Sequence, residues 1–412
     1  MKKRVSLFLA LMVVLTTVIL SATPVFAAPR LNNYPIVLVH GLGGFGRDEA
    51  LGIRYWGMLF DIQEYLKSQG YNTYTVGVGP VSSNWDRACE TYAQIKGGTV
   101  DYGAAHAAAH RHARYGRTYP GYYPEWGNVD EATGKIKKVH LIGHSMGGQT
   151  IRTLVQLLEQ GSPADTAASP DASPLFTGGK SWVSGCMSIS TPHDGTSLDN
   201  AINKGVPWLQ DFIGSMAALF GPNNLYDLKL DQWGLVRSPG ESVDSYLNRV
   251  WSSSFWQSKD DMSNVDLTVE GARALNGWVK AQPDVYYFSW ATSTTFREIF
   301  TGRQIPMLST NVMLMATAGH IGAYTRNNPG EIPITSEWWR NDGLVPVICQ
   351  DGPSINSTDT IVSFNGSPRI GAWNYMGLKD GYDHLDIIGM GTLWDPRGWY
   401  LQQAQLLGSL NN

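Results

Sequence analysis

Apolar residues in this chain occur mainly as short runs, with segments of helical spacing between them. Residues 35–41 form one run that ends at a glycine, which is typical of a strand buried on both faces of a parallel sheet. Further strands are predicted at residues 72–78, 138–142, 183–189, 285–290 and 344–349. Residues 56–67 show helical spacing at Met58, Leu59, Ile62 and Leu66. This alternation predicts an α/β fold with a mostly parallel central sheet and helices on both faces.

The N-terminal segment has the three parts of a secretory signal. Lys2, Lys3 and Arg4 precede an apolar run from Val5 to Leu20, and Val25-Phe26-Ala27 resembles a signal peptidase site. We predict a signal peptide over residues 1–27, a secreted protein, and a single domain over residues 28–412. A retained membrane anchor is the alternative, because the run is nearly long enough to span a bilayer. No later stretch is, so the mature chain is not expected to be an integral membrane protein.

Two internal segments depart from the alternation. Residues 84–128 are rich in aromatic residues and histidine and lack a clean period, which predicts an inserted subdomain. Residues 207–220 predict an amphipathic helix. Its apolar face would carry Leu209, Phe212, Ile213, Met216 and Phe220.

Composition narrows the function further. The net charge is −4 and there are no basic runs after the predicted signal peptide, so nothing indicates nucleic-acid binding. The three cysteines, Cys89, Cys186 and Cys349, form no disulfide framework, and their odd number leaves at least one thiol free. A chain of 412 residues can bury a large core without covalent cross-links.

The most informative motif is Gly143-His144-Ser145-Met146-Gly147. An apolar strand ends just before it, and Ile151, Leu154, Val155 and Leu158 follow at helical spacing. Strand, glycine turn and helix together are typical of a nucleophile elbow, in which a strained turn exposes the serine. We therefore predict that Ser145 is a nucleophile. A simple turn is the alternative.

A serine nucleophile needs a base that a carboxylate orients, and in this architecture the partners follow in the order Ser, Asp, His. Asp342, in a polar turn, and His384, near the C-terminus, fit that order. His193 and Asp194 are the rival pair, whereas Asp383 and Asp386 lie too close in sequence to His384 to orient it easily.

The oxyanion also needs hydrogen-bond donors. For these we predict the backbone N–H groups of Met146, which follows the nucleophile, and Leu42, in the loop after the first strand.

With these residues identified, the chain resembles the thermoalkaliphilic lipases of bacilli and the related staphylococcal lipases, which have the α/β-hydrolase fold. The resemblance covers nearly the whole mature chain. It rests on segments 40–41, 55–57, 84–87, 100–106, 227–234, 341–343 and 383–385. Gly143 follows the staphylococcal form of the elbow, since bacillar members usually carry alanine there. The resemblance implies triacylglycerol hydrolysis by the triad above, a helical lid, and structural zinc and calcium.

The metal ligands come from the resemblance. From the residues alone, His106 and His110 would pair on one helical face, or the histidines would form a solvated cluster. The resemblance instead implies a zinc site of Asp86, His106, His112 and Asp261, which needs a break in the helix between the two histidines.

For calcium, the resemblance implies Asp386, the Asp395-Pro396 pair and a backbone carbonyl near Ser309. Asp395-Pro396 fits only if residues 391–394 are an insertion, and the family has glycine where this chain has Ser309. Ordinary surface acids are the alternative.

Together these features predict a secreted lipase that works through an acyl-enzyme at a water–lipid interface, with residues 197–220 as the lid. An ordinary buried helix is the alternative for that segment. A short-chain carboxylesterase or thioesterase with the same triad is the alternative enzyme. The third alternative is a non-catalytic surface-binding protein that a metal stabilises.

Overall fold

The computed structural model describes residues 29–198, 207–218, 225–258, 260–392 and 394–411. The predicted signal peptide, residues 1–27, lies outside the described residues, as does part of the predicted lid. Within the described ranges, no helix is both long enough and apolar enough to cross a membrane.

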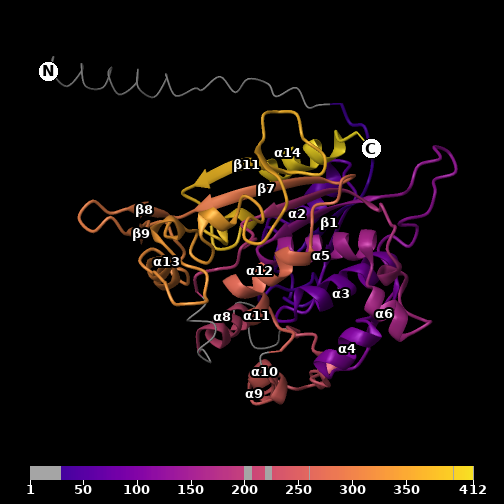
Figure 1. Ribbon diagram of the computed structural model, residues 1–412, viewed down its shortest axis with the longest axis horizontal. Coiled ribbons are helices and arrows are strands. Elements are labelled where there is room, and N and C mark those ends of the chain that lie inside the picture. Colours follow the sequence, from indigo (N-terminus) through magenta and orange to yellow (C-terminus); the bar gives the residue numbers. More distant parts are fainter. Residues whose placement is uncertain (1–28, 199–206, 219–224, 259, 393, 412) are drawn as a thin grey trace.

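A seven-stranded sheet forms the centre of the molecule (Figure 1), and every neighbouring pair of its strands is parallel. The strand order is β10-β11-β7-β6-β5-β1-β2. The strands are β1 (Ile36–Val39), β2 (Thr73–Val76), β5 (Val139–His144), β6 (Val183–Ile189), β7 (Tyr286–Ser293), β10 (Ile361–Ser363) and β11 (Trp373–Asp380). The predicted parallel α/β sheet is confirmed.

Helices cover both faces of the sheet, because alternate strand residues point to opposite sides. Ile36 and Leu38 of β1 belong to one core, whereas Val37 and Val39 belong to the other. Helices α2 (Ile62–Ser68) and α14 (Arg397–Gly408) pack on the first side, and α3 (Asn84–Lys96) and α5 (Met146–Gln160) on the second. The predicted arrangement of helices on both faces is therefore confirmed.

Smaller elements surround these layers. Two antiparallel pairs stand apart from the main sheet: β3 (Gly98–Asp101) with β4 (Tyr115–Tyr119), and β8 (Thr295–Arg297) with β9 (Gln304–Pro306). The other α-helices are α4 (Ala104–His110), α6 (Pro163–Ala168), α8 (Pro207–Ala218), α9 (Val243–Trp251), α10 (Ser254–Ser258), α11 (Ser263–Asp266), α12 (Val269–Trp278) and α13 (Met315–Ile321). Short 3₁₀ helices are Pro174–Thr177, Asp231–Trp233, Ser336–Trp338, Val347–Cys349 and Asp386–Ile388.

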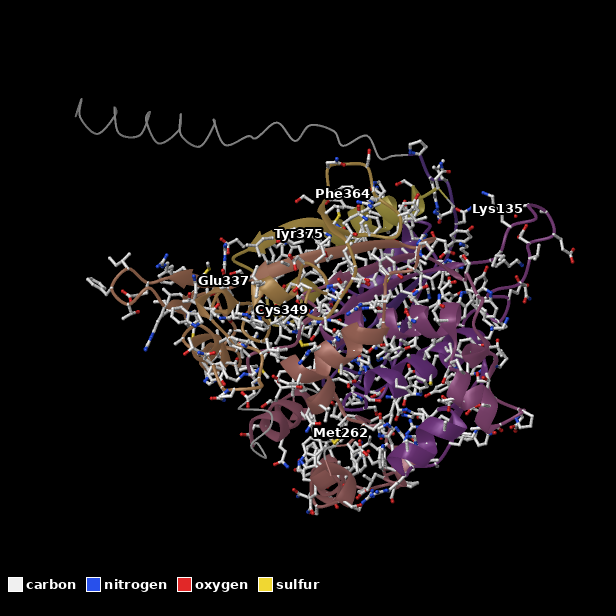
Figure 2. All side chains as sticks on the ribbon, in the orientation of Figure 1. Lys135, Met262, Glu337, Cys349, Phe364 and Tyr375 are labelled. Atoms are coloured by element: carbon white, nitrogen blue, oxygen red, sulfur yellow. The ribbon has the colours of Figure 1, made fainter. Side chains whose placement is uncertain are left out.

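The strand predicted at residues 344–349 is wrong. This segment is a tight turn followed by the 3₁₀ helix Val347–Cys349, because the Asp342 carboxylate accepts hydrogen bonds from the backbone of Leu344 and Val345. Pro346 also has no N–H to donate to a ladder. Beyond β7 the sheet instead continues with β11 and ends at the edge strand β10, on the side of the molecule where Figure 2 labels Phe364 and Tyr375.

The helix predicted from residue 56 is also shorter than expected. It begins at Ile62, after a turn in which Gly57, Met58 and Asp61 have positive φ. The Asp61 side chain accepts a hydrogen bond from the Glu64 N–H and so caps the helix. Leu59, expected on the apolar face, is exposed in that turn.

The stretch 84–128 contains two kinds of structure. Its first part, α3, is a helix of the main fold that is buried on nearly all sides, and this is why no apolar period was visible. Only the later part, from β3 through α4 to β4, stands off the sheet. The three cysteines are all buried and free, and Cys349 is labelled in Figure 2.

Candidate functional site

Ser145 occupies a strained turn between β5 and α5. Its φ of 57° and ψ of −132° lie in a region that residues with a side chain rarely adopt. The glycines beside it are required by space: a Cβ at Gly143 would overlap the backbone of Gly147, and one at Gly147 would overlap the carbonyl of Val39. The predicted strand, turn and helix are therefore present, with Ser145 at the N-cap of α5.

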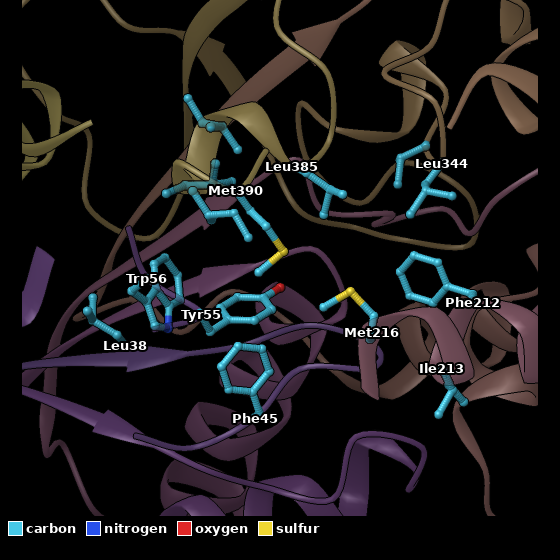
Figure 3. Close-up of a cluster of buried hydrophobic side chains, with 14 of the residues drawn as sticks. Leu38, Phe45, Tyr55, Trp56, Phe212, Ile213, Met216, Leu344, Leu385 and Met390 are labelled. Carbon is cyan, nitrogen blue, oxygen red and sulfur yellow. The ribbon is translucent and has the colours of Figure 1, made fainter. Parts of the chain in front are cut away.

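Ser145 opens into a cavity with mostly apolar walls. His384 lines the same cavity. The other lining residues are Leu42, Tyr55, Pro192, Thr196, Leu198, Phe212, Met216, Leu267, Leu344, Val345 and Leu385. Figure 3 shows Phe212 and Met216 of α8 facing Leu344, Leu385 and Tyr55.

The segment predicted as a lid is described only in part. Of residues 197–220, the described parts are residues 197–198 and α8, and both contribute to the cavity wall. Phe212, Ile213 and Met216 are buried, as the predicted amphipathic pattern requires. The lid itself stays a prediction.

Asp342 and His384 form a hydrogen-bonded pair at the cavity. The His384 Nδ1 lies 2.8 Å from Asp342 Oδ2, and both side chains are almost fully buried. Asp342 is held from several directions: its Oδ1 accepts from the N–H groups of Leu344 and Val345, and its Oδ2 accepts from the Thr292 hydroxyl at 2.9 Å. The backbone N–H of His384 also donates to the Asp342 carbonyl at 2.8 Å. The pair is thus fixed through both side chains and backbone.

A series of consecutive, buried hydrogen bonds joins three loops of the site. The Gly41 N–H donates to the Tyr55 hydroxyl at 3.0 Å, and that hydroxyl lies 2.7 Å from His144 Nδ1. His144 Nε2 lies 2.9 Å from the carbonyl oxygen of His384. Burial, with a smaller effect of the nearby His384, lowers the pKa of His144 well below its usual range, so its ring is neutral.

A neutral imidazole carries one hydrogen, and a carbonyl can only accept one. The hydrogen of His144 therefore sits on Nε2, and Tyr55 donates to Nδ1.

The backbone N–H groups predicted for the oxyanion are unengaged. Those of Leu42 and Met146 have no hydrogen-bond partner among the residues that the structure describes. The loop before Leu42 is fixed by the buried guanidinium of Arg87, which donates to the carbonyls of His40 and Gly79. Gly41, just before Leu42, lies against Ser145, and Met146 directly follows it, so both N–H groups belong to backbone beside Ser145.

The rival acids and bases are engaged elsewhere. His193 Nε2 lies 2.8 Å from the Ser188 hydroxyl, and Asp194 accepts from the backbone of Ser354, so this pair shapes a buried loop outside the cavity wall. Asp383 accepts from N–H groups of its own loop and from that of Asn311, and burial raises its pKa to about 6.

A cluster of potential metal ligands lies in the subdomain beside α3. Ligand atoms of Asp86, His106, His112 and Asp261 all lie within 4.8 Å of one another. Helix α4 ends at His110, and Arg111 adopts a left-handed φ of 63°, which turns His112 back toward His106. The His106 and His110 rings do pack together, as helical spacing predicts, but His110 Nδ1 lies 3.0 Å from Asp260 and His110 is not part of the cluster.

The residues predicted for calcium are only partly brought together. Asp386 accepts from the Asp383 N–H, and Asp383 in turn holds the Asn311 N–H, so Asp386 belongs to the same loop cluster as residues 309–311. The Asp395 carboxylate, next to Pro396, is paired with Arg397 at 2.7 Å. Calcium, with Ser309, Asp386, Asp395 and Pro396, stays a prediction.

Several residues of the site were not predicted. Tyr55 lies 89 positions from His144, and Thr292 lies 50 positions from Asp342, so no local pattern connects them. Tyr55 does lie in one of the segments that carry the family resemblance, which was the only signal available.

The sheet and the turn at its carboxyl edge define the α/β-hydrolase fold. The chain belongs to the family described as "Lipase-like, C-terminal domain", whose model matches residues 32–399. It is 38% identical over 377 residues to Lipase 2 of Staphylococcus aureus, covering 88% of this chain and 51% of that protein. The chain therefore spans about half the length of the curated relatives it matches.

Two solved structures are more similar. EstA from Clostridium botulinum has a TM-score of 0.86 and 49% identity, covering 92% of this chain and 88% of that one. Lipase 1 from Pelosinus fermentans has a TM-score of 0.85 and 50% identity, covering 93% of this chain and 100% of that one. These similarities confirm the predicted fold class and the resemblance to staphylococcal lipases.

Proposed function

We propose that this protein is a lipase that hydrolyses ester bonds of triacylglycerols, with Ser145 as nucleophile, His384 as base and Asp342 as the orienting acid. One observation carries this proposal: His384, which is hydrogen-bonded to Asp342, and the strained Ser145 turn border the same apolar cavity. Relatives that are named lipases support the substrate class.

In this mechanism the Ser145 hydroxyl attacks the ester carbonyl while His384 Nε2 takes its proton. Asp342 holds the Nδ1–H and stabilises the imidazolium that forms. The backbone N–H groups of Leu42 and Met146 donate to the oxyanion. His384 then protonates the leaving alcohol, which gives an acyl-enzyme, and a water activated by the same imidazole releases the fatty acid.

The cavity walls suit an acyl chain. Phe212 and Met216 approach from α8 and Leu344, Leu385 from the opposite loops, so a bound hydrocarbon would be surrounded by apolar side chains (Figure 3). We propose that α8 belongs to a lid that exposes this cavity at a lipid interface. Secretion through residues 1–27 is part of the same proposal.

We further propose that Asp86, His106, His112 and Asp261 bind a structural zinc ion. The His106 Nε2 lies 3.3 Å from Asp86 Oδ1 and 3.2 Å from Asp261 Oδ2, and the His112 Nε2 lies 3.3 Å from Asp261 Oδ2. A tetrahedral zinc site with bonds of about 2.0–2.1 Å has ligand–ligand edges of about 3.3 Å. Three of the six ligand–ligand distances thus match a tetrahedral zinc site.

The remaining atoms of these side chains support the same assignment. Asp86 Oδ1 and His112 Nε2 are buried without a hydrogen-bond partner. The other atom of each has one: Gln232 donates to Asp86 Oδ2, and His112 Nδ1 lies 2.9 Å from the Ala113 carbonyl. Such outer contacts fix the orientation of metal ligands and leave one atom of each for the ion. A bound zinc would fasten α3, α4 and the segment at Asp261 together.

The function is tested with a fluorophosphonate probe and two substrates. We expect the probe to label the chain and the Ser252→Ala control, in which an exposed serine is removed, but not Ser145→Ala. Ser145→Ala should also lose the hydrolysis of emulsified long-chain triacylglycerol, which the control should keep. Activity confined to soluble short-chain esters would favour the esterase, and a chain that is never labelled would be a binding protein.

A further inference from the structure

Exposed apolar side chains are concentrated on the β8–β9 hairpin and the loop that follows it. Ile299 is 88% exposed, Phe300 90%, Leu308 100% and Val312 82%, and Phe296 is 47% exposed. We call these five residues the hairpin patch. Large apolar side chains this exposed within so short a segment usually mark an interaction surface.

The hairpin presents these side chains on a preorganised tip. Strands β8 and β9 pair from Thr295–Pro306 to Arg297–Gln304, and the Glu298 N–H donates to the Arg303 carbonyl. The Glu298 carboxylate accepts from the N–H groups of Phe300 and Thr301, at 2.5 and 2.8 Å. The tip thus keeps Ile299 and Phe300 outward, and in Figure 1 the hairpin projects from the body beside α13.

Two cations border the apolar tip. Arg297 and Arg303 are exposed, and neither forms an ion pair with the residues that the structure describes. The Glu298 charge between them is turned onto its own loop. The chain as a whole is acidic, with a net charge of −4, so this positive, apolar projection contrasts with the rest of the molecule. Apolar residues flanked by arginine are typical of segments that lie in the interface of a lipid layer.

The patch is continuous with the loops of the proposed active site. Between Leu308 and Val312, the Asn311 N–H donates to Asp383 at 2.7 Å, and Asp383 directly precedes His384. Further along the same segment, Leu314 packs so closely on Gly343 that a Cβ there would contact it. A surface bound by the patch would therefore lie next to the loops that carry Asp342 and His384.

We propose that the hairpin patch inserts into the surface of a lipid layer and anchors the enzyme there, with Arg297 and Arg303 against anionic head groups. This inference rests on the proposed lipase function, because it concerns how the enzyme reaches an aggregated substrate. A protein partner that adds a strand is less suited, since β8 and β9 have only three residues each.

The test separates binding from hydrolysis. In a Ser145→Ala background, partition is measured onto phosphatidylcholine vesicles with and without phosphatidylglycerol. Replacing Ile299 and Phe300 together by serine should weaken partition on the order of 100-fold, because two large apolar side chains are lost from the lipid. Arg297→Gln with Arg303→Gln should weaken partition only where phosphatidylglycerol is present.

The matched control is Val129→Ser. Val129 is 61% exposed on the surface turn of residues 129–136, in the projecting loop where Figure 2 labels Lys135, on the side of the view opposite the β8–β9 hairpin. This change should leave partition unaltered. In the active chain, the Ile299/Phe300 double variant should hydrolyse emulsions poorly and soluble short-chain esters normally.

Three outcomes would overturn the proposal. These are unchanged partition of the double variant, an equal loss in the Val129 control, or an equal loss of activity on a soluble ester. A double variant that changes oligomeric state but not partition would identify an interface between copies of this chain. If Ser145→Ala still hydrolysed esters, the proposed function would fail, whereas the vesicle measurement would remain valid.

Discussion

Replacing Tyr55 by phenylalanine tests the hydrogen bonds that join the loops of the site. The change removes one oxygen, which accepts from Gly41 at 3.0 Å and lies 2.7 Å from His144 Nδ1. The ring remains, and with it the edge contacts to Phe45 and Trp56. Any effect therefore comes from the two lost hydrogen bonds.

The size of the effect follows from what is left behind. The Gly41 N–H and His144 Nδ1 are both buried and would lose their partner, and an unsatisfied buried group costs about 1–3 kcal/mol. We expect the free energy of unfolding to fall by about 2–4 kcal/mol, allowing for partial relaxation. Because Gly41 precedes Leu42 and His144 holds the backbone of His384, kcat should also fall, by about tenfold for each 1.4 kcal/mol of lost transition-state stabilisation.

Tyr400→Phe is the matched control. Tyr400 is equally buried and packs edge-on against Trp56, but its hydroxyl has no hydrogen-bond partner among the described residues. Denaturant unfolding should show no loss for this variant. The reasoning is refuted if Tyr55→Phe costs less than about 0.5 kcal/mol, the range of ordinary surface substitutions. It is equally refuted if Tyr55→Phe and His144→Phe prove additive in a double-mutant cycle, because the two groups would then be uncoupled.

Three further predictions concern the acid, the metal and one buried histidine. Asp342→Asn should reduce kcat on a soluble ester by about 10⁴, through loss of the correct His384 tautomer, while the variant stays folded by circular dichroism; a loss below tenfold would contradict the assigned role. Metal analysis should find zinc bound. At a free zinc concentration of about a hundred times its Kd, binding should raise the free energy of unfolding by about 2.7 kcal/mol. Asp261→Asn should lose the metal, and His110→Ala should keep it. Metal that stays bound in Asp261→Asn, or that is lost from His110→Ala, would contradict the proposed site. Burial lowers the pKa of His140 to about 3, so between pH 6 and pH 4 this histidine takes up a proton in the unfolded chain but not in the folded one. As the pH falls over that range, the free energy of unfolding should therefore decrease by about 1.4 kcal/mol per pH unit more than it does in His140→Gln. A difference between the two chains that does not vary with pH would refute this.

The sheet was predictable where burial alone decides the sequence. Strands such as Val183–Ile189 lie between two others and are covered on both faces, so they require continuous apolar residues. The same reasoning failed at residues 344–349, where an apolar run forms the wall of the cavity instead of a strand. It also missed Trp373–Asp380, a strand that mixes Asn, Lys and Asp with apolar residues and shifts register midway. An apolar run indicates that a segment is buried, but it does not indicate whether that segment is a strand, a helix or a turn.

The features of the candidate site likewise differ in how far the sequence predicts them. The strained turn at Ser145 could be predicted because it requires glycines at fixed spacing, which form a local motif in the sequence. The convergence of His106 and His112 depends on one left-handed residue, Arg111, which helical spacing does not indicate. Only the family resemblance implied that break. Contacts between distant loops, such as Tyr55 with His144, leave no local pattern at all.

Asp342 differs from the other members of the proposed triad in how it is positioned. Ser145 directly follows β5, and His384 comes shortly after β11, so the sheet itself places them. Asp342 lies in a turn outside the sheet, so no strand positions it. Its own carboxylate does so by accepting hydrogen bonds from the backbone of Leu344 and Val345 and from the Thr292 hydroxyl near the end of β7. The carboxylate that we propose as the orienting acid thus also holds the loop that carries it. Loss of that carboxylate therefore acts on catalysis and on local structure together, which is why Asn, able to keep some of these hydrogen bonds, is the informative substitution.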